Sequence, residues 1–516
     1  MPGARGGVSW RVVSARRAAR SAPTAVRTEG VPRAIATAAW LVLLVGLGAA
    51  AAFNLWLALQ LLGRPDETRY GEAVLYDHAS RLLRGEALYQ PLDRPPYTIA
   101  TYTPLYYWLA AGLRVLVGPG FLAGRLVSLG AGLVSAGLVG WLVWRHTRAA
   151  VAAFVAGLVF IGLGLGGLVP WSAAYKEDLL AVALGVASVV ALDSAPARPG
   201  RVVLAGGLAA AAVLTKQSLA GPAIVGVVWL LAARRVRLAA LFAATVLVLG
   251  LWTGALLEVT THAFVANALG GNLHQPFDVL TFEVNVRELA IYQTVPSVLT
   301  VAAIAVSRRR HVDLLVLSWL GSLLPMLALG AIGADSNYWL QFAALSAVLA
   351  TLWLWRVRRS WWGVIGAVLL VGNAALAVQG VAGWLQARPG FLESGAAVAE
   401  PMRQLVERVS RSSGTVLADP LDVLVLAGRP VLLEPIVYGL REQDGSWDPS
   451  PLVARVCGGE VSLVVLGYPP EEIGQRFPQA VAAAVQQTFV VDQTVRLAGG
   501  QRWVLVPRTD RSGCFT

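Results

Sequence analysis

Two acidic residues, Asp66 and Glu67, follow directly on the first long apolar run of this sequence. A carboxylate can take the proton from an attacking hydroxyl group when the fold holds it beside the reacting atoms. One interpretation of these residues is therefore catalytic. The other is structural: a helix end in water, with Asp66 capping the next helix. Position alone favours the structural interpretation.

Only Lys176 and Lys216 of the 42 basic residues are lysines, and each lies between two apolar runs. A lysine ammonium is a compact charge that can stabilise the negative charge growing on a departing phosphate group. We predict that the two lysines come together on one phosphate; the alternative is that both extend to the membrane surface as ordinary side chains. Asp178 follows close behind Lys176, and it either takes part in catalysis or only caps a helix and complements its dipole.

A third polar group, formed by Asp335, Asn337 and Tyr338, lies beside a late apolar run. Amide, carboxylate and aromatic side chains together suit the hydroxyl groups and ring faces of a sugar. Tyrosine and tryptophan are also common anchors at the membrane surface, which is the structural alternative. His262 and His274, twelve residues apart, are a weak signal for a metal ion, and no metal site is predicted.

The elements that must position these residues are hydrophobic. The chain has 516 residues, 56% of them hydrophobic and only 14% charged, and its mean hydropathy is positive. This composition indicates a polytopic α-helical membrane protein rather than a soluble one. The formal net charge of +12 comes from arginines in small clusters between apolar runs. Such clusters do not form a nucleic-acid-binding face, so no nucleic-acid partner is expected.

About eleven segments have an apolar character consistent with membrane crossings, two of them short. They lie at residues 36–62, 121–144, 149–169, 178–193, 202–214, 218–233, 238–257, 291–306, 313–333, 338–355 and 361–384. The short pair, 202–214 and 218–233, could instead form a re-entrant hairpin.

Five arginine-rich connections alternate with connections that carry the acidic residues. By the positive-inside rule the arginine-rich ones are cytoplasmic, which puts the N-terminus inside and every candidate site residue outside. The arginine-rich connections contain residues 145–148, 198–201, 234–237, 308–310 and 356–359.

Three regions follow from this topology: a basic cytoplasmic tail at 1–34, a membrane module at 35–388 and a small α/β extracytoplasmic domain at 389–516. The membrane module carries outer loops at 63–120 and 258–290. In the first of these loops, 66–84 and 103–118 are expected to form helices at the membrane interface. The C-terminal domain holds the only cysteines, Cys457 and Cys514, as a disulfide or as two free thiols.

The segment "DETRYGE", residues 66–72, resembles the acidic motif that opens the first outer loop of GT-C superfamily membrane glycosyltransferases. Weaker matches are Gly85 with Tyr89, the Pro-Leu-Tyr-Tyr-Trp of 104–108, "LTKQ" around Lys216 and "KEDLL" from Lys176. Together they cover roughly residues 36–345. The layout is similar to the lipid A aminoarabinose transferases and the protein O-mannosyltransferases, in a less characterised bacterial branch.

The resemblance implies transfer of a hexosyl or pentosyl group from a polyprenyl-phosphate donor to an acceptor hydroxyl group on the outer face of the membrane, with inversion. Asp66 would be the base, and the further catalytic candidates are Glu67 and Asp178. The candidates for the donor phosphate are Arg69, Lys176 and Lys216. The candidates for the sugar or the acceptor are Tyr70, Tyr102, Tyr106, Asp335, Asn337 and Tyr338.

The expected setting is the bacterial plasma membrane, and the acceptor is a glycan, lipid or protein of the cell envelope. No cofactor is expected, and a divalent metal ion stays open. The sequence departs from the family at one point: Tyr102-Thr103-Pro104 stands where Lys-Pro-Pro is common. A donor contact that the family has there is therefore missing.

Two other classes of protein compete with this interpretation. A transporter or flippase for a lipid-linked sugar predicts inverted repeats and ionisable groups in mid-membrane, whereas the sequence shows no internal repeat and its charges gather at one face. A scaffold or sensor built around the outer domain predicts that removing residues 390–516 abolishes function, while Asp66→Asn leaves it intact.

Overall fold

The structure, a computed structural model, describes residues 30–167, 170–194, 198–271, 275–306, 313–392, 395–497 and 500–509. Most of the basic N-terminal tail, the arginines at 308–310, His274 and Cys514 lie outside the described residues.

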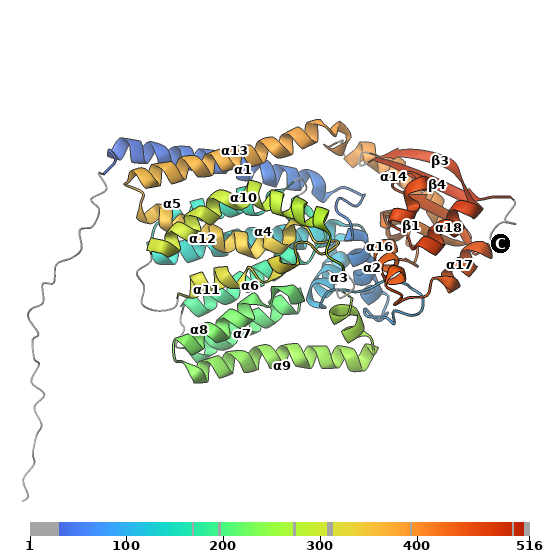
Figure 1. The fold of residues 1–516 in the computed structure, drawn as a ribbon, viewed down its shortest axis with the longest axis horizontal. Helices are drawn as coiled ribbons and strands as arrows, with labels where there is room; N and C mark the ends of the chain where they lie inside the picture. Colours follow the sequence, from blue (N-terminus) through green and yellow to red (C-terminus); the bar gives the residue numbers. More distant parts are fainter. Residues whose placement is uncertain are drawn as a thin grey trace, which may run out of the picture.

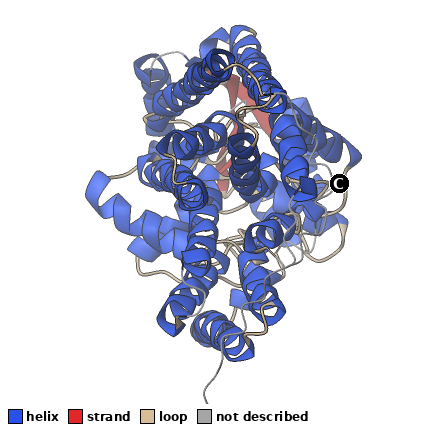
Figure 2. Cartoon of the chain, turned by 90° about the vertical axis from the view of Figure 1, so that its left-hand side faces the viewer, coloured by secondary structure: helices blue, strands red, loops and turns tan. Residues whose placement is uncertain are grey.

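Helices form at each of the eleven apolar segments, and they run side by side along the long axis of the molecule (Figure 1). Figure 2 looks along this bundle, with the strands of the C-terminal domain behind it. Six helices are long and apolar enough to cross a membrane: α1 (Arg33–Leu62), α4 (Leu122–Thr147), α9 (Val236–Thr261), α10 (Val279–Val306), α12 (Leu340–Arg356, counted with the preceding turn) and α13 (Trp361–Gln386). The shorter members are α5 (Ala150–Val159), α6 (Asp178–Ser194), α7 (Pro199–Val213), α8 (Gly221–Ala232) and α11 (Leu314–Gly321).

Three expected boundaries are wrong. The segment 313–333 is not one helix, because α11 ends at Gly321 and a 3₁₀ turn, Pro325–Ala328, follows. The segment 149–169 changes from α5 to a π-helical turn at Phe160–Gly164. The expected outer loop 258–290 is shorter, because α9 and α10 continue past its edges. Charged side chains end a hydropathy run without ending a helix.

The outer loop after α1 contains the two predicted helices, α2 (Glu72–Leu83) and α3 (Leu105–Val117). Helix α2 begins later than expected, since Gly71 before it has a left-handed φ of 85°. Its polar residues Glu72, Asp77 and Arg81 are buried, although a helix lying at the membrane interface would expose such residues. The reason is that α3 and the C-terminal domain pack against this helix.

The C-terminal domain contains a four-stranded sheet in the order β1-β2-β4-β3. Strands β1 (Thr415–Asp419) and β2 (Val461–Leu466) are parallel, and β4 (Gly500–Pro507) is antiparallel to β2 and to β3 (Phe489–Leu497). The helices around them are α14 (Gly395–Arg411), α15 (Asp422–Leu426), α16 (Pro435–Gln443), α17 (Ser450–Cys457) and α18 (Gln479–Thr488). Cys457 is disulfide-bonded.

The segment 430–434 pairs with the outer loop rather than with this sheet. Tyr97 N donates to the Leu432 carbonyl at 2.7 Å, and Glu434 N donates to the Tyr97 carbonyl at 2.8 Å. One hydrophobic cluster also includes Val74 and Tyr76 of α2 together with Met402 and Val465 of the C-terminal domain. The outer loop and the C-terminal domain therefore share a core.

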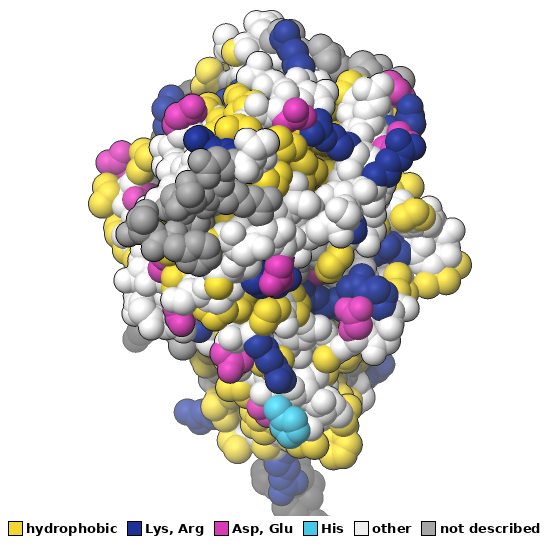
Figure 3. All heavy atoms as spheres, turned by 90° about the vertical axis from the view of Figure 1, so that its right-hand side faces the viewer, with side chains coloured by type: hydrophobic (Ala, Val, Ile, Leu, Met, Phe, Trp, Pro, Cys, Tyr) yellow, Lys and Arg dark blue, Asp and Glu magenta, His cyan; other side chains and the backbone are white. Residues whose placement is uncertain are grey.

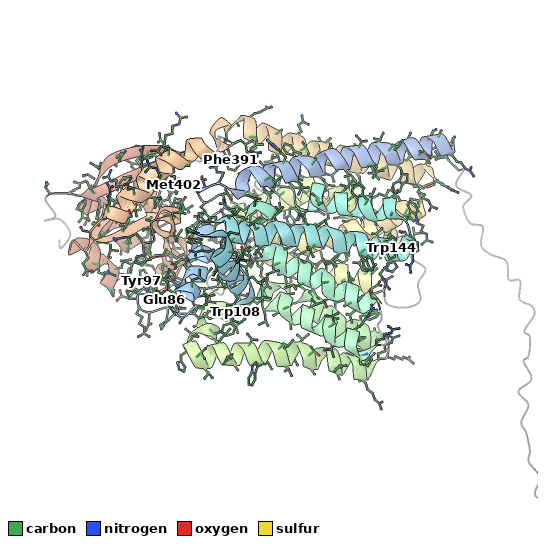
Figure 4. The ribbon with its side chains drawn as sticks, turned by 180° about the vertical axis from the view of Figure 1, so that it is seen from behind. Glu86, Tyr97, Trp108, Trp144, Phe391 and Met402 are labelled. Atoms are coloured by element: carbon green, nitrogen blue, oxygen red, sulfur yellow. The ribbon has the colours of Figure 1, made fainter. Side chains whose placement is uncertain are left out.

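The two ends of the bundle differ in charge. The arginine-rich connections after α4, α8 and α12 lie at the end far from the C-terminal domain, where Figure 4 labels Trp144. The opposite end is formed by the C-terminal domain, whose face carries side chains of both signs (Figure 3). The connections that carry the acidic residues lie between this domain and the bundle.

Candidate functional site

The segment 64–72 is held by a buried ion pair that the sequence did not predict. Arg125 on α4 donates to both carboxylate oxygens of Glu72, at 3.0 and 2.8 Å, and neither side chain is exposed to solvent. The same guanidinium group donates to the carbonyls of Arg64 at 2.7 Å and Asp66 at 2.8 Å. Glu72 also accepts from Thr68 N at 2.6 Å. One arginine thus fixes both ends of the motif.

Asp66 is paired inside this segment. Arg64 donates to its two carboxylate oxygens at 2.8 and 2.5 Å, and both side chains are buried. Arg64 also donates to the carbonyl of Phe391, which Figure 4 labels at the start of the C-terminal region. Asp66 does not cap α2, since that helix begins at Glu72 after Gly71. The capping interpretation is therefore wrong.

Glu67 differs from its neighbour, because one of its carboxylate oxygens is buried and has no hydrogen-bond partner among the described residues. Its backbone N–H donates to the Asp422 carboxylate of the C-terminal domain at 3.2 Å. Burial, followed by the charges of Asp422 and Glu72, holds the pKa of Glu67 well above its usual range, while Lys176 opposes this rise. A raised pKa makes this carboxylate a stronger proton acceptor than an exposed one.

Lys216 and the acids before α6 form a compact cluster. The Lys216 ammonium lies 2.5 Å from Asp178 and 2.9 Å from Glu177. Asn337 donates to the same Asp178 oxygen at 2.9 Å. Burial alone would lower the pKa of Lys216, but the Asp178 and Glu177 carboxylates outweigh it and hold this pKa well above its usual range. Two acidic groups thus surround the single positive charge of Lys216.

Two aromatic rings complete the cluster around Lys216. Its ammonium lies 5.0 Å from the ring centre of Tyr102 and 5.2 Å from that of Tyr338. Three connections that are far apart in sequence therefore meet here, as the alternation of the connections in the sequence predicts. Asp178, which begins α6, and Asn337 lie in the same cluster.

Lys176 forms no ion pair or hydrogen bond through its side chain among the described residues. Its ammonium lies beside Gly71, where the Cβ atom of any larger residue would be 2.7 Å away. Its charge acts on Glu67, Glu177 and, in the C-terminal domain, Glu434. This half-buried ammonium thus lies where the motif, the corner before α6 and the C-terminal domain meet.

Arg69 turns away from both lysines. It pairs with Asp335, and its guanidinium group lies 3.9 Å from the ring centre of Trp171. The Arg69 charge lowers the pKa of Asp335 against the effect of burial. The Trp171 indole in turn donates to Ser336 Oγ at 2.9 Å, so this cation has a carboxylate and an aromatic partner.

The remaining predicted tyrosines lie in different surroundings. Tyr106 is buried, and its hydroxyl group donates to the Gly124 carbonyl at 3.1 Å. Tyr70 is 41% exposed and faces Arg476 of the C-terminal domain, whose guanidinium group lies 5.2 Å from its ring centre. Tyr106 is therefore engaged inside the fold, and Tyr70 lies at the domain junction.

The C-terminal domain supplies site residues that sequence reasoning missed, chiefly Asp422 and Arg476. Arg476 is anchored by Asp419 at the end of β1, with N–O distances of 2.5 and 3.2 Å. Arg64 and Arg125 were also missed. No residue spacing could have found these pairs, since most join segments far apart in sequence.

No group of three or more His, Cys, Asp or Glu side chains placed to hold a metal ion occurs in the described part of the chain. His262 ends α9 with a left-handed φ of 53°.

No protein-family model matches this chain, and no curated protein matches it in sequence. Its fold matches the crystal structure of ArnT from Cupriavidus metallidurans bound to undecaprenyl phosphate, with a TM-score of 0.61 and 15% identity, covering 91% of this chain and 99% of that one. It also matches the apo oligosaccharyltransferase of Archaeoglobus fulgidus, with a TM-score of 0.53 and 13% identity, covering 87% and 72% of the two chains. Both are GT-C superfamily members, so the fold expected from the resemblance is confirmed.

Proposed function

Because the chain has the GT-C fold, we propose that it is a glycosyltransferase that moves a sugar from a polyprenyl-phosphate carrier to an acceptor hydroxyl group. The similar ArnT structure has undecaprenyl phosphate bound, and an oligosaccharyltransferase structure of the same fold contains dolichol phosphate. These likenesses support a lipid-linked donor. The choice between a hexosyl and a pentosyl donor is left to the experiment below.

The observation that carries the proposal is which of the three candidate cations form ion pairs with carboxylates. Lys216 is neutralised by Glu177 and Asp178, and Arg69 is paired with Asp335. Lys176 has no such partner among the described residues and lies against the motif at Gly71. A compact ammonium group with no carboxylate partner favours a ligand that brings its own negative charge. We therefore propose that Lys176 binds the donor phosphate. Lys216 and Arg69 hold the surrounding segments in place through their ion pairs.

The geometry favours Glu67 over Asp66 as the proton acceptor. Both oxygens of Asp66 are used by Arg64, whereas Glu67 has a buried oxygen without a partner and a raised pKa. General bases work best when their pKa lies near the working pH. In this proposal Asp66 holds the loop in place, and Asp178 orients Lys216 instead of reacting.

The reaction is a single displacement. The acceptor oxygen attacks the anomeric carbon and gives its proton to Glu67, while the bond from that carbon to the phosphate oxygen breaks and its electron pair leaves with the phosphate. Attack from the side opposite the leaving group inverts the anomeric centre. Lys176 stabilises the negative charge of the departing phosphate, so the reaction as proposed needs no nucleotide or redox cofactor.

We further propose that the site end of the bundle faces the outside of a bacterial plasma membrane. The arginine-rich connections lie at the other end, and such connections are usually cytoplasmic. The polyprenyl tail would then remain in the bilayer while its phosphate reaches the junction with the C-terminal domain. Tyr102 and Tyr338 flank Lys216, and Tyr70 lies against Arg476 at the domain junction; all three are proposed to contact the sugar or the acceptor.

The test is incubation of the purified full-length protein with a panel of radiolabelled polyprenyl-phosphate hexoses and pentoses and a cell-envelope extract as acceptor. The proposal predicts that one donor releases free polyprenyl phosphate and that label appears in the acceptor. Movement of an intact lipid-linked sugar across a vesicle membrane, without cleavage, would instead establish the flippase alternative.

A further inference from the structure

A large cavity lies between α2 and the C-terminal domain, at the end of α2 away from Lys176. Its volume is about 980 Å³, at the upper end of the roughly 300 to 1,000 Å³ typical of small-molecule pockets. One wall is formed by the second half of α2 and the loop to Pro96, and the other by β1 and the segments at 428–432 and 455–460. Figure 4 labels Glu86 and Tyr97 at this junction. We refer to this cavity as the junction groove.

Six of the seven charged side chains that line the junction groove are paired with one another, and the seventh, Arg429, donates to the Gly414 carbonyl. Arg81 donates to Asp77 at 2.8 Å in a buried pair at the base. At the rim, Arg84 pairs with Glu86 at 2.6 Å, and across the groove Arg455 pairs with Glu460 at 2.7 Å. Among the described residues Arg429 alone of this lining has no carboxylate partner, so the three paired arginines need no counter-charge from a ligand.

Two acceptor oxygens in the same groove have hydrogen-bonding capacity left. The Gln90 side-chain oxygen is buried and has no hydrogen-bond partner among the described residues. The Asp77 oxygen that Arg81 does not bind lies 3.7 Å from the Arg84 guanidinium group, which is too far for a hydrogen bond. Burial raises the pKa of Asp77 in spite of Arg81 and Arg84. A buried acceptor without a partner costs free energy until a donor reaches it.

We propose that the junction groove binds a neutral glycan chain, which the protein uses as its acceptor. Sugar hydroxyl groups donate to Gln90 and Asp77 and accept from Arg84 and Arg455, so one ligand satisfies both kinds of group. A phosphate carries only acceptors for these oxygens and would be repelled by them. The flat apolar faces of Pro95 and Pro96 complete the lining against the ring carbons.

The position of the groove fits an acceptor that is a chain. Helix α2 has Glu72 of the motif at one end and Asp77 to Arg84 along the groove, and its 12 residues span about 18 Å. A glycan held in the groove extends along this helix toward Lys176 and Glu67. This inference rests on the proposed function, since it names the acceptor of the same reaction.

The test uses full-length protein in lipid nanodiscs without donor, titrated with linear six-unit oligosaccharides from mannan, galactan, arabinan and glucan. We expect at least one of them to bind. Gln90→Leu removes the free acceptor while keeping the side-chain volume, and it should weaken binding by roughly three- to tenfold, the effect of one hydrogen bond. Arg403→Ala, on the exposed face of α14, is the matched control and should change nothing.

Three results overturn the proposal: no oligosaccharide binds, Gln90→Leu binds as tightly as the wild type, or a basic peptide binds in its place with the same dependence on Gln90. Donor cleavage is measured in parallel. Glycan binding without cleavage of any donor refutes the proposed function but supports glycan binding in the junction groove. Cleavage with a lipid acceptor and no glycan binding refutes the groove alone.

Discussion

Neighbouring carboxylates in this site have different partners and therefore different tasks. Asp66 is tied by both oxygens to Arg64, and Glu72 by both oxygens to Arg125. Glu67 lies between them in sequence and keeps an oxygen free of any partner within the described part of the chain. A carboxylate locked into an arginine pair is a weak base, because protonation would break the pair. In the proposed mechanism the motif thus separates the residue that reacts from the residues that hold it.

This difference predicts the relative damage of two substitutions. Glu67→Gln should lower the transfer rate by about 100-fold or more, the usual effect of losing a general base. Asp66→Asn keeps one acceptor for Arg64 and should cost about tenfold, through a looser loop. Initial rates at saturating donor, with folding checked by gel filtration, compare the two. A larger loss in Asp66→Asn than in Glu67→Gln would return the role of the base to Asp66.

At the scale of elements, the site depends on one residue of a membrane helix. Arg125 on α4 links the end of α1, the motif and the start of α2 through the Leu61, Arg64 and Asp66 carbonyls and the Glu72 carboxylate. Because the guanidinium group is fully buried, none of these bonds is weakened by water. The loop is therefore as rigid as the helix that holds it.

Removing Arg125 should destabilise the protein strongly. Arg125→Ala leaves Glu72 as a buried charge without its partner, which costs about 3 to 5 kcal/mol. The apparent melting temperature in detergent should fall by several degrees, whereas Arg403→Ala, in an exposed pair, should leave it nearly unchanged. Equal melting temperatures for the two variants would mean that the Arg125 pair does not hold the loop.

The helical elements could be predicted because long apolar runs separated by arginine clusters leave few other structures open. The exact ends of the helices could not be predicted, because they depend on proline and glycine residues that a hydropathy pattern does not reveal. Pro325 follows the end of α11, and Gly71 delays the start of α2. The segment 430–434 reads as a strand, yet it pairs with Tyr97 rather than with the sheet, because its partner is set by tertiary packing.

The candidate site could be predicted only in part for a similar reason. Alternation of the loops places the corners of Lys176, Lys216 and Asp335 at one end of the bundle, so their proximity follows from topology. The pairing of each charge does not follow, since Lys216 takes both acids next to Lys176 and leaves that residue without an ion pair among the described residues. Such choices are made by side-chain packing over long sequence distances.

At the scale of the whole molecule, the C-terminal domain is part of the site rather than an appendage. It shares a hydrophobic cluster with α2, its Asp422 accepts from Glu67 N, and its Arg476 covers Tyr70. Glu434 is buried at the junction and accepts from Ile99 N at 3.2 Å. Both the stability of the junction and the state of the site therefore depend on this domain.

The junction should lose stability as pH rises toward neutrality. Burial raises the pKa of Glu434 from 4.5 to about 7, so the folded protein retains a proton that the unfolded chain releases near pH 4.5. Between these values the unfolded state becomes relatively more favourable, by up to about 3 kcal/mol. Glu434→Gln should match the wild type in melting temperature at pH 4 and exceed it at pH 8. An advantage of the variant that grows as the pH falls would contradict the assignment.

The most direct test of the central claim is the rate of polyprenyl phosphate release from an accepted donor by the wild type and by Lys176→Gln. Lys176 has no ion pair to lose among the described residues, so the variant should fold and melt like the wild type. Its release rate should fall by about 100-fold or more, as when a charge-stabilising group is removed from an active site. Undiminished release by Lys176→Gln would contradict the account.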